Sequence, residues 1–131
     1  MIDRETQFSR NDRWASRSVF AADDRQEALR LADIGLRRQR DHFVAGGHAS
    51  PGDALADMIT AFDVHVGTPD DVITSLRADS TLERVTDLVF QAHSIDPPHP
   101  FILRSIELIA QKVAPALGWT KTTAADAALV D

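Results

Sequence analysis

Residues 66–77, VGTPDDVITSLR, decide how the middle of the chain folds. Thr68 can accept a hydrogen bond from a free backbone N–H at a helix start, and Pro69 is tolerated at the first helical position because an N–H there has no helical partner. Asp70 and Asp71 in the first turn complement the positive end of the helix dipole. We therefore predict a helix that begins after Thr68. Its buried edge would consist of Val72, Ile73 and Leu76.

Three short strands are predicted outward from this helix. Residues 62–66 alternate apolar and polar side chains, which is typical of a strand with one buried face. Residues 17–22 place a brief apolar run between charged flanks and indicate a second strand. Residues 88–90, Leu-Val-Phe, are continuously apolar, a pattern that predicts a strand covered on both faces.

Three further helices are predicted around these strands. The first runs from about residue 24 to 45 and ends at a pair of glycines. The second begins at Ser50 and Pro51 and continues to about Thr60. The third follows the stiff, proline-rich loop 94–100. The stripe expected to be buried in the first helix is Leu29, Ala32, Leu36 and Phe43, and that of the third is Ile102, Ile106, Ile109, Ala110, Val113 and Leu117.

The order of these elements defines the class of fold. Strands separated by helices favour parallel pairing and an α/β fold. We expect residues 1–16 to form a polar amino-terminal segment without regular structure, residues 17–119 to form the folded domain, and residues 120–131 to be a loose tail.

Composition excludes several classes of function. The formal net charge is −6, so a general attraction to nucleic-acid phosphates or anionic membranes is not expected. The chain has no cysteine, which removes disulfides, thiolate metal sites and cysteine nucleophiles. Its amino terminus lacks the apolar core of a secretory signal, so we expect a cytoplasmic protein.

Three segments carry a resemblance to a known family. They are SVFAADDRQEALRLA (18–32), VGTPDDVITSLR (66–77) and TDLVFQAHSIDPPHPFILRSIELIAQKVAPALGW (86–119). In this order they resemble the carboxy-terminal part of the luciferase-like flavin-dependent monooxygenases, a (β/α)₈ barrel family. By this resemblance, residues 86–93 look like the last barrel strand, and the helix after residue 100 looks like the one that packs outside it.

The resemblance implies a partial (β/α)₈ TIM barrel, rich in helix and with two or three short strands. The chain has 131 residues, about half the length of a complete barrel. Its relatives, as the resemblance implies, use reduced FMN or a deazaflavin, often with oxygen, on a small organic substrate. We therefore expect an oxidoreductase segment that is truncated or needs a partner, such as a complementary barrel half or a second copy.

Candidate site residues follow from the position of catalytic sites in barrels. Such sites lie at the carboxyl ends of the strands, which draws attention to Gln91, His93, Ser94 and Asp96. His93 and Ser94 are the candidates for cofactor binding. The His93 ring could bond to a flavin phosphate, a flavin ring edge or a substrate oxygen, or it could simply bond to a neighbouring loop. The sequence identifies no catalytic residue.

Two other site types are not supported. The remaining histidines show no His-Glu-x-x-His spacing, so no metal site is predicted. The arginines at 37, 38 and 40 lie on the same predicted helix as Asp33 and Asp41, and this mixture of charges indicates a solvated helix face. The alternative to an enzyme segment is a cofactor-free α/β interaction or oligomerisation module, which would associate through an open sheet edge and the apolar face of helix 101–117.

Overall fold

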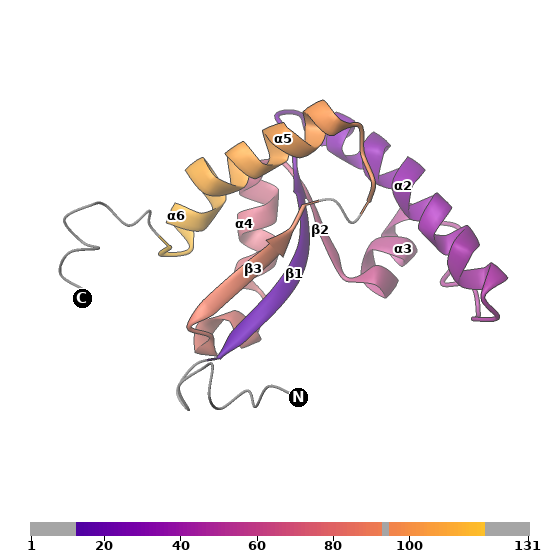
Figure 1. The fold of residues 1–131 in the computed structure, drawn as a ribbon, viewed down its shortest axis with the longest axis horizontal. Helices are drawn as coiled ribbons and strands as arrows, with labels where there is room; N and C mark the ends of the chain where they lie inside the picture. The colour runs from indigo at the N-terminus through magenta and orange to yellow at the C-terminus, as the bar shows by residue number, and fades with distance from the viewer. Residues whose placement is uncertain (1–12, 93–94, 120–131) are drawn as a thin grey trace, which may run out of the picture.

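The computed structural model describes residues 13–92 and 95–119 (Figure 1). Three strands and several helices alternate along the chain, as the sequence predicted. The elements are β1 (Trp14–Ala21), α2 (Arg25–Ala45), α3 (Leu55–Phe62), β2 (Val64–Gly67), α4 (Pro69–Arg77), the 3₁₀ helix η1 (Ser80–Arg84), β3 (Asp87–Gln91), α5 (His99–Leu108), the π-helical turn η2 (Ile109–Val113) and α6 (Ala114–Ala116).

The three strands form one parallel sheet in the order β2-β1-β3. Ser18 to Ala21 pair with Val64 to Gly67 on one side of β1, and Trp14 to Ser18 pair with Asp87 to Gln91 on the other. The α/β class and the parallel pairing are confirmed. In a (β/α)₈ barrel each strand lies beside the next strand of the chain. Here the first strand lies between the second and the third, so the order differs from that of three successive barrel strands.

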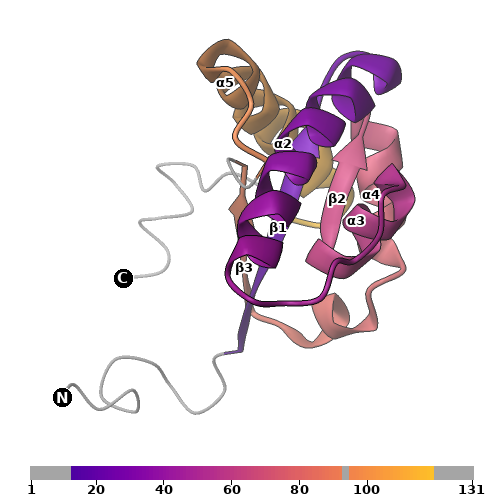
Figure 2. The ribbon, with the colours of Figure 1, turned by 90° about the vertical axis from the view of Figure 1, so that its right-hand side faces the viewer.

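Helices cover both faces of the sheet and create two cores. Val19 and Ala21 point to the face where helix α4 and the α5–η2 segment pack, together with Leu76 and Leu108. Phe20 points to the opposite face, where helices α2 and α3 contribute Leu36 and Met58 (Figure 2). Because successive side chains of a strand point to opposite faces, residues 19–21 alone serve both cores.

Helix α4 begins as predicted. The Thr68 hydroxyl accepts a hydrogen bond from the backbone N–H of Asp71, and the Asp71 carboxylate accepts one from the backbone N–H of Thr68. This reciprocal capping box satisfies two backbone donors that the helix cannot satisfy itself. Val72, Ile73 and Leu76 form the buried edge of the helix.

Helices α2 and α3 differ in detail from the predicted ones. Helix α2 has the expected length, and Ala32 and Leu36 are buried as predicted, but Leu29 is only partly buried. The helix buries Ala28, Leu31 and Gly35 as well. Phe43, predicted to be buried, is 38% exposed, although its ring stacks on His48 and meets Phe62 edge-on. Helix α3 begins only at Leu55, capped by Ala54, so the predicted start at Ser50 is wrong.

The strands also differ from their predicted patterns. Strand β1 begins at Trp14, inside the segment expected to be irregular, because its first residues pair with β3. The His65 side chain of β2 is buried rather than exposed. Strand β3 is not covered on both faces, because the Val89 side chain is half-exposed.

The last helical segment starts earlier than predicted, and its buried face agrees with the prediction only in part: Ile109 and Val113 are buried, and Leu117 packs against the same core. Helix α5 begins at His99, since Pro98 and Pro100 suit a helix start. The buried residues are Ser105, Leu108, Ile109 and Val113, whereas Ile106 and Ala110 are exposed. No helix within the described residues is long and apolar enough to cross a membrane.

Candidate functional site

The carboxyl end of the sheet is the natural place for a ligand. Helix α2 leaves the end of β1 on one face of the sheet, and helix α5 follows β3 on the other, so the two loops diverge there (Figure 2). In open α/β sheets, ligands bind in the crevice formed where neighbouring strands send their helices to opposite faces. Strand β1 sends its helix to one face, and both of its neighbours, β2 and β3, send theirs to the other, so this arrangement occurs on either side of β1.

The loop after β3 is anchored on both sides of the predicted cofactor residues. Ala92 and Ile95 are buried, and Ile95 packs in the core beneath helix α2. Gly35 allows this approach, because a Cβ there would lie 1.7 Å from the Ile95 carbonyl oxygen. His93 and Ser94 lie outside the described residues, so their predicted role in cofactor binding stays a prediction.

The other two residues singled out at this end do not form a common site with each other. Asp96 has a φ of 51° and its carboxylate accepts a hydrogen bond of 2.8 Å from Arg38 of helix α2. Asp tolerates this left-handed conformation better than most residues. Gln91 is exposed on strand β3. The structure thus gives Asp96 a role in tying its loop to helix α2.

Two hollows flank Phe101 at the start of helix α5. The first, of about 210 Å³, lies between the end of β1 and helix α5 and is lined by Ala22, Asp23, Glu27 and Arg104 among others. The second, of about 440 Å³, lies between helix α2 and residues 96–98 and is lined by Ile34 and Arg38 among others. Phe101 contributes to both, so its ring separates two shallow binding surfaces.

Two arginine–aspartate pairs hold the loops at this end. Arg104 binds the Asp23 carboxylate through Nε and Nη2, at 2.9 and 2.7 Å, and also pairs with Glu107. Arg25 binds Asp71 through Nε and Nη2, at 2.8 and 2.6 Å. Hydrogen bonds from these arginines lower the pKa of both aspartates. The start of α2 is therefore tied to α5 on one side and to the start of α4 on the other.

The charges at this end do not suit a flavin phosphate. The three arginines that line the two hollows, Arg30, Arg38 and Arg104, are all paired with carboxylates. Asp23, Asp24 and Glu27 add negative charge to the smaller hollow. The start of helix α5 offers few donors, because its prolines have no N–H and the N–H groups of residues 101 and 102 donate to the Pro98 carbonyl. The described residues that line these two hollows therefore do not form a phosphate site.

His65 is a potentially functional residue that the strand pattern did not reveal. Its Nδ1 lies 2.5 Å from the Ser75 hydroxyl of helix α4, and its buried Nε2 has no hydrogen-bond partner among the described residues. Burial lowers the pKa of this imidazole. Alternation with Val64 and Val66 predicted an exposed side chain, and the nearby serine, ten residues later, was the only clue to a partner.

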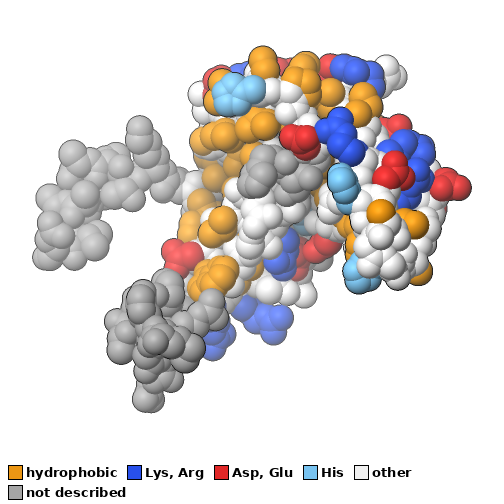
Figure 3. Space-filling view, turned by 45° about the vertical axis from the view of Figure 1, so that its right-hand side comes forward, with side chains coloured by type: hydrophobic (Ala, Val, Ile, Leu, Met, Phe, Trp, Pro, Cys, Tyr) orange, Lys and Arg blue, Asp and Glu red, His pale blue; other side chains and the backbone are white. Residues whose placement is uncertain are grey.

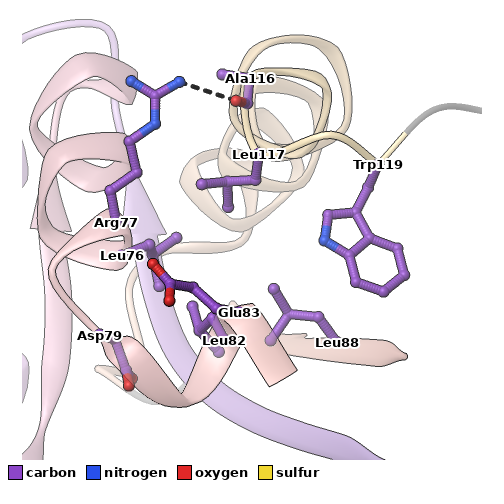
Figure 4. Close-up of a pocket in the computed structure, with 9 residues that line it drawn as sticks. All are labelled: Leu76, Arg77, Asp79, Leu82, Glu83, Leu88, Ala116, Leu117 and Trp119. Atoms are coloured by element: carbon purple, nitrogen blue, oxygen red, sulfur yellow. Dashed lines mark hydrogen bonds between the residues drawn. The ribbon is translucent and has the colours of Figure 1, made fainter. Parts of the chain in front are cut away.

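A further hollow, of about 210 Å³, lies at the opposite end of the sheet. Figure 4 shows it between η1 and the end of helix α6, where Arg77 donates a hydrogen bond of 2.9 Å to the Ala116 carbonyl. The Trp119 side chain extends from the end of α6 toward the side of the sheet that carries Leu88. Leu88, at the start of strand β3, lines this hollow.

Comparisons with known proteins point to one enzyme class. No protein-family model matches the chain, and no curated protein does. A solved structure that matches is the oxygenating constituent of 3,6-diketocamphane monooxygenase from the CAM plasmid of Pseudomonas putida, a type II Baeyer-Villiger monooxygenase in complex with FMN. The identity is 27% and the TM-score 0.50, over 82% of this chain. The chain spans 34% of that protein.

This match indicates a fold similar to a segment of that flavin-dependent monooxygenase. It supports a flavin ligand without placing the flavin in this chain. Among the described residues, no group of three His, Asp or Glu side chains could hold a metal ion.

Proposed function

We propose that this chain is the carboxy-terminal segment of a luciferase-like flavin-dependent monooxygenase. It would supply one wall of a flavin site rather than a complete catalyst. The observation that carries the proposal is the structural match of 82% of the chain to an FMN-bound monooxygenase at 27% identity. Because the chain spans 34% of that protein, most of the site would come from elsewhere.

Within such a site, the chain's own residues would shape and position rather than bind phosphate. Phe101 offers an apolar ring between two hollows, a surface that suits the flat ring of FMN or a deazaflavin. The Asp23–Arg104 pair would hold the loop after β1 in place beneath it. When bound, the flavin supplies the redox chemistry, and the protein orients it beside a small organic substrate.

The phosphate contacts would then come from groups outside the described residues. His93 and Ser94 remain candidates, because they follow β3 in the sequence and their neighbours Ala92 and Ile95 are buried. Cations from the rest of the enzyme would be needed as well, since Arg38 and Arg104 are already paired. We therefore expect the chain alone to bind FMN weakly or not at all.

A chimera tests the proposal. Residues 13–119 would replace the matching segment of the oxygenating constituent of the diketocamphane monooxygenase, and FMN binding would be followed by flavin fluorescence. A folded chimera that retains saturable FMN binding supports the proposal, and a folded chimera without it contradicts the proposal. An unrelated parallel α/β segment of the same length, inserted at the same place, is the control.

The chain alone, titrated with FMN and with a deazaflavin, gives a second measurement. Weak or absent binding agrees with the paired arginines at the carboxyl end. Tight binding by the isolated chain would contradict the claim that its site is incomplete.

The alternative function is a cofactor-free α/β interaction module. The strand order β2-β1-β3 favours it, because a barrel would require β3 to leave β1 and pair beside β2. A chain that associates stably without flavin, and whose chimera folds without binding FMN, would fit this alternative. The cytoplasmic location expected from the sequence stays a prediction.

A further inference from the structure

Strand β3 presents an open edge. In the part of the chain that the structure describes, β3 pairs only with β1 and lies at the end of the sheet. Its side chains are also poorly covered: Leu88 and Phe90 are partly buried on one face, and Val89 is 50% exposed on the other. An exposed strand edge with apolar side chains is a template for pairing with another strand.

The apolar surface beside β3 continues onto helix α5 and the turn after it. A groove of about 310 Å³ lies between them, and residues that line it include Phe90, Ile106, Ala110 and Trp119. Ile106 is 50% exposed, and Leu103, three residues earlier on the helix, is 54% exposed. Figure 3 shows hydrophobic side chains gathered below helix α5 on this side of the molecule. Edge and groove together form one surface suited to a strand with an adjoining apolar helix.

The sequence of β3 is complementary to itself in one arrangement. If two copies pair antiparallel about Val89, Asp87 of one copy lies opposite Gln91 of the other, and Leu88 lies opposite Phe90. No like charges are then opposed. A parallel pairing in register would instead place the two Asp87 carboxylates opposite each other, which is unfavourable. Charge and side-chain type therefore favour the antiparallel arrangement.

The same arrangement also covers the groove. A two-fold axis perpendicular to the sheet keeps equivalent faces on the same side, so the α5 helices of two copies lie on one face of a joined sheet. The exposed stripe of Leu103 and Ile106 from one copy would then face its equivalent. A self-complementary patch of this kind is what a two-fold symmetric dimer requires.

We propose that strand β3 and helix α5 form a homodimer interface, in which two β3 strands pair antiparallel about Val89 and join two three-stranded sheets into one. This inference rests on the edge, the groove and the register. A strand of a complementary barrel half would occupy the same β3 edge, so a homodimer of this kind supports the interaction module and excludes a barrel completed at β3. The occupant of the groove is thus a second copy of this chain.

Sedimentation equilibrium of the full chain over a wide range of concentrations tests the proposal. We expect a reversible monomer–dimer equilibrium. Gln91→Asp places an Asp opposite Asp87 twice in each dimer and should weaken dimerisation, whereas Gln91→Lys places a Lys there and should strengthen it. Each change should alter the dissociation constant by about two- to thirty-fold, in opposite directions.

A second variant pair tests the centre of the interface. Val89→Lys opposes two lysines on the two-fold axis and should abolish the dimer, whereas Val89→Thr keeps a β-branched, neutral side chain and should retain it. Circular dichroism and thermal unfolding of each variant show whether the monomer still folds. Because Gln91 is exposed, its variants keep the test decisive even if Val89→Lys unfolds the chain.

Three results would overturn the inference. A chain that stays monomeric at every concentration would mean that the groove is covered by another polypeptide or by the chain's own terminal residues. A dimer that responds equally to Asp and Lys at position 91 would exclude the antiparallel register. A dimer that survives Val89→Lys with a folded monomer would place the interface elsewhere.

Discussion

Strands β2 and β3 are both edge strands of one sheet, yet their surroundings differ. In β2, Val64, His65 and Gly67 are buried, and helix α4 follows directly and packs on the strand. In β3, alternate residues are exposed, and the helix that follows packs mainly over β1 instead. The backbone N–H of Ala21 in β1 donates a hydrogen bond of 3.0 Å to the buried Ser105 hydroxyl of α5.

The difference shows that covering a strand depends on where its helix goes. The β2–α4 unit closes through local contacts, because a helix capped at Thr68 must turn back over the strand that ends at Gly67. The β3–α5 connection is longer and carries helix α5 across β1. Alternate side chains of β3 are therefore left exposed. Both strands have an unpaired backbone edge within the described chain, but the side chains of β2 are covered and those of β3 are left half-exposed.

The largest effect is expected where the β3–α5 loop meets helix α2. In Gly35→Ala, the new Cβ would lie 1.7 Å from the Ile95 carbonyl oxygen, so the loop must move. The better helix propensity of alanine, about 1 kcal/mol, cannot offset this clash. We expect the variant to lose about 3 kcal/mol of unfolding free energy in denaturant titrations.

Gly46→Ala is the matched control for this change. A Cβ at Gly46 would make ordinary contacts of 3.5 Å, and its φ of −80° suits alanine. Its unfolding free energy should change by no more than about 0.5 kcal/mol. Equal losses in the two variants would show that the loop does not pack against Gly35 as described.

A matched pair of valines compares the two edges directly. Val64 of β2 is 6% exposed, whereas Val89 of β3 is 50% exposed. Val64→Ala should cost about 2 kcal/mol, because it leaves a cavity in the core. Val89→Ala should cost about 0.5 kcal/mol or less in the monomer.

Chemical denaturation at low protein concentration, where any dimer dissociates, measures both changes. Similar losses for the two valines would mean that β3 is covered as fully as β2, and the comparison of the two edges would fail.

The contrast between the edges also explains what the sequence could predict. The capping box of α4 was predicted correctly because Thr68 and Asp71 are three residues apart and need no tertiary partner. The α2 stripe was predicted correctly at Ala32 and Leu36 but not at Leu29 and Phe43, because which helix face is buried depends on where Ile95 and the sheet lie. The strand order and the exposure of β3 depend on the path of helix α5. The contact of Ser105 in α5 with Ala21 in β1 joins residues 84 apart, and local sequence patterns do not encode it.

From the sequence, only the location of the candidate site could be predicted, and not the pairing of its charged residues. The rule that sites lie at the carboxyl ends of strands led to the end of the sheet where two hollows meet at Phe101. The pairing of Arg104 with Asp23, which are 81 residues apart, could not be anticipated. Because Arg104 is paired with Asp23, it holds the loop after β1 and is not free to bind a phosphate.

A pH dependence of stability is also expected, and it originates at His65 in strand β2. Burial lowers the pKa of His65, and the carboxylates of Asp63 and Asp79, with the guanidinium of Arg17, are the charges that act on it. Asp79 is itself paired with Arg17 at 2.6 Å, which limits its support for a charged imidazole. The native state therefore keeps this imidazole neutral at pH values where the unfolded chain already binds the proton.

Because the unfolded state takes up the proton first, stability should fall as the pH is lowered from about 6.5 toward the lower pKa of the folded state. The slope from this one group cannot exceed about 1.4 kcal/mol per pH unit. Urea titrations of the wild type and of His65→Gln across this range measure it, with exposed His42→Gln as the control. Loss of the slope in His65→Gln alone assigns it to the buried imidazole. A slope that His65→Gln leaves unchanged would mean that His65 is not buried as a neutral imidazole beneath α4. Helix α4 would then cover strand β2 less completely than the geometry indicates.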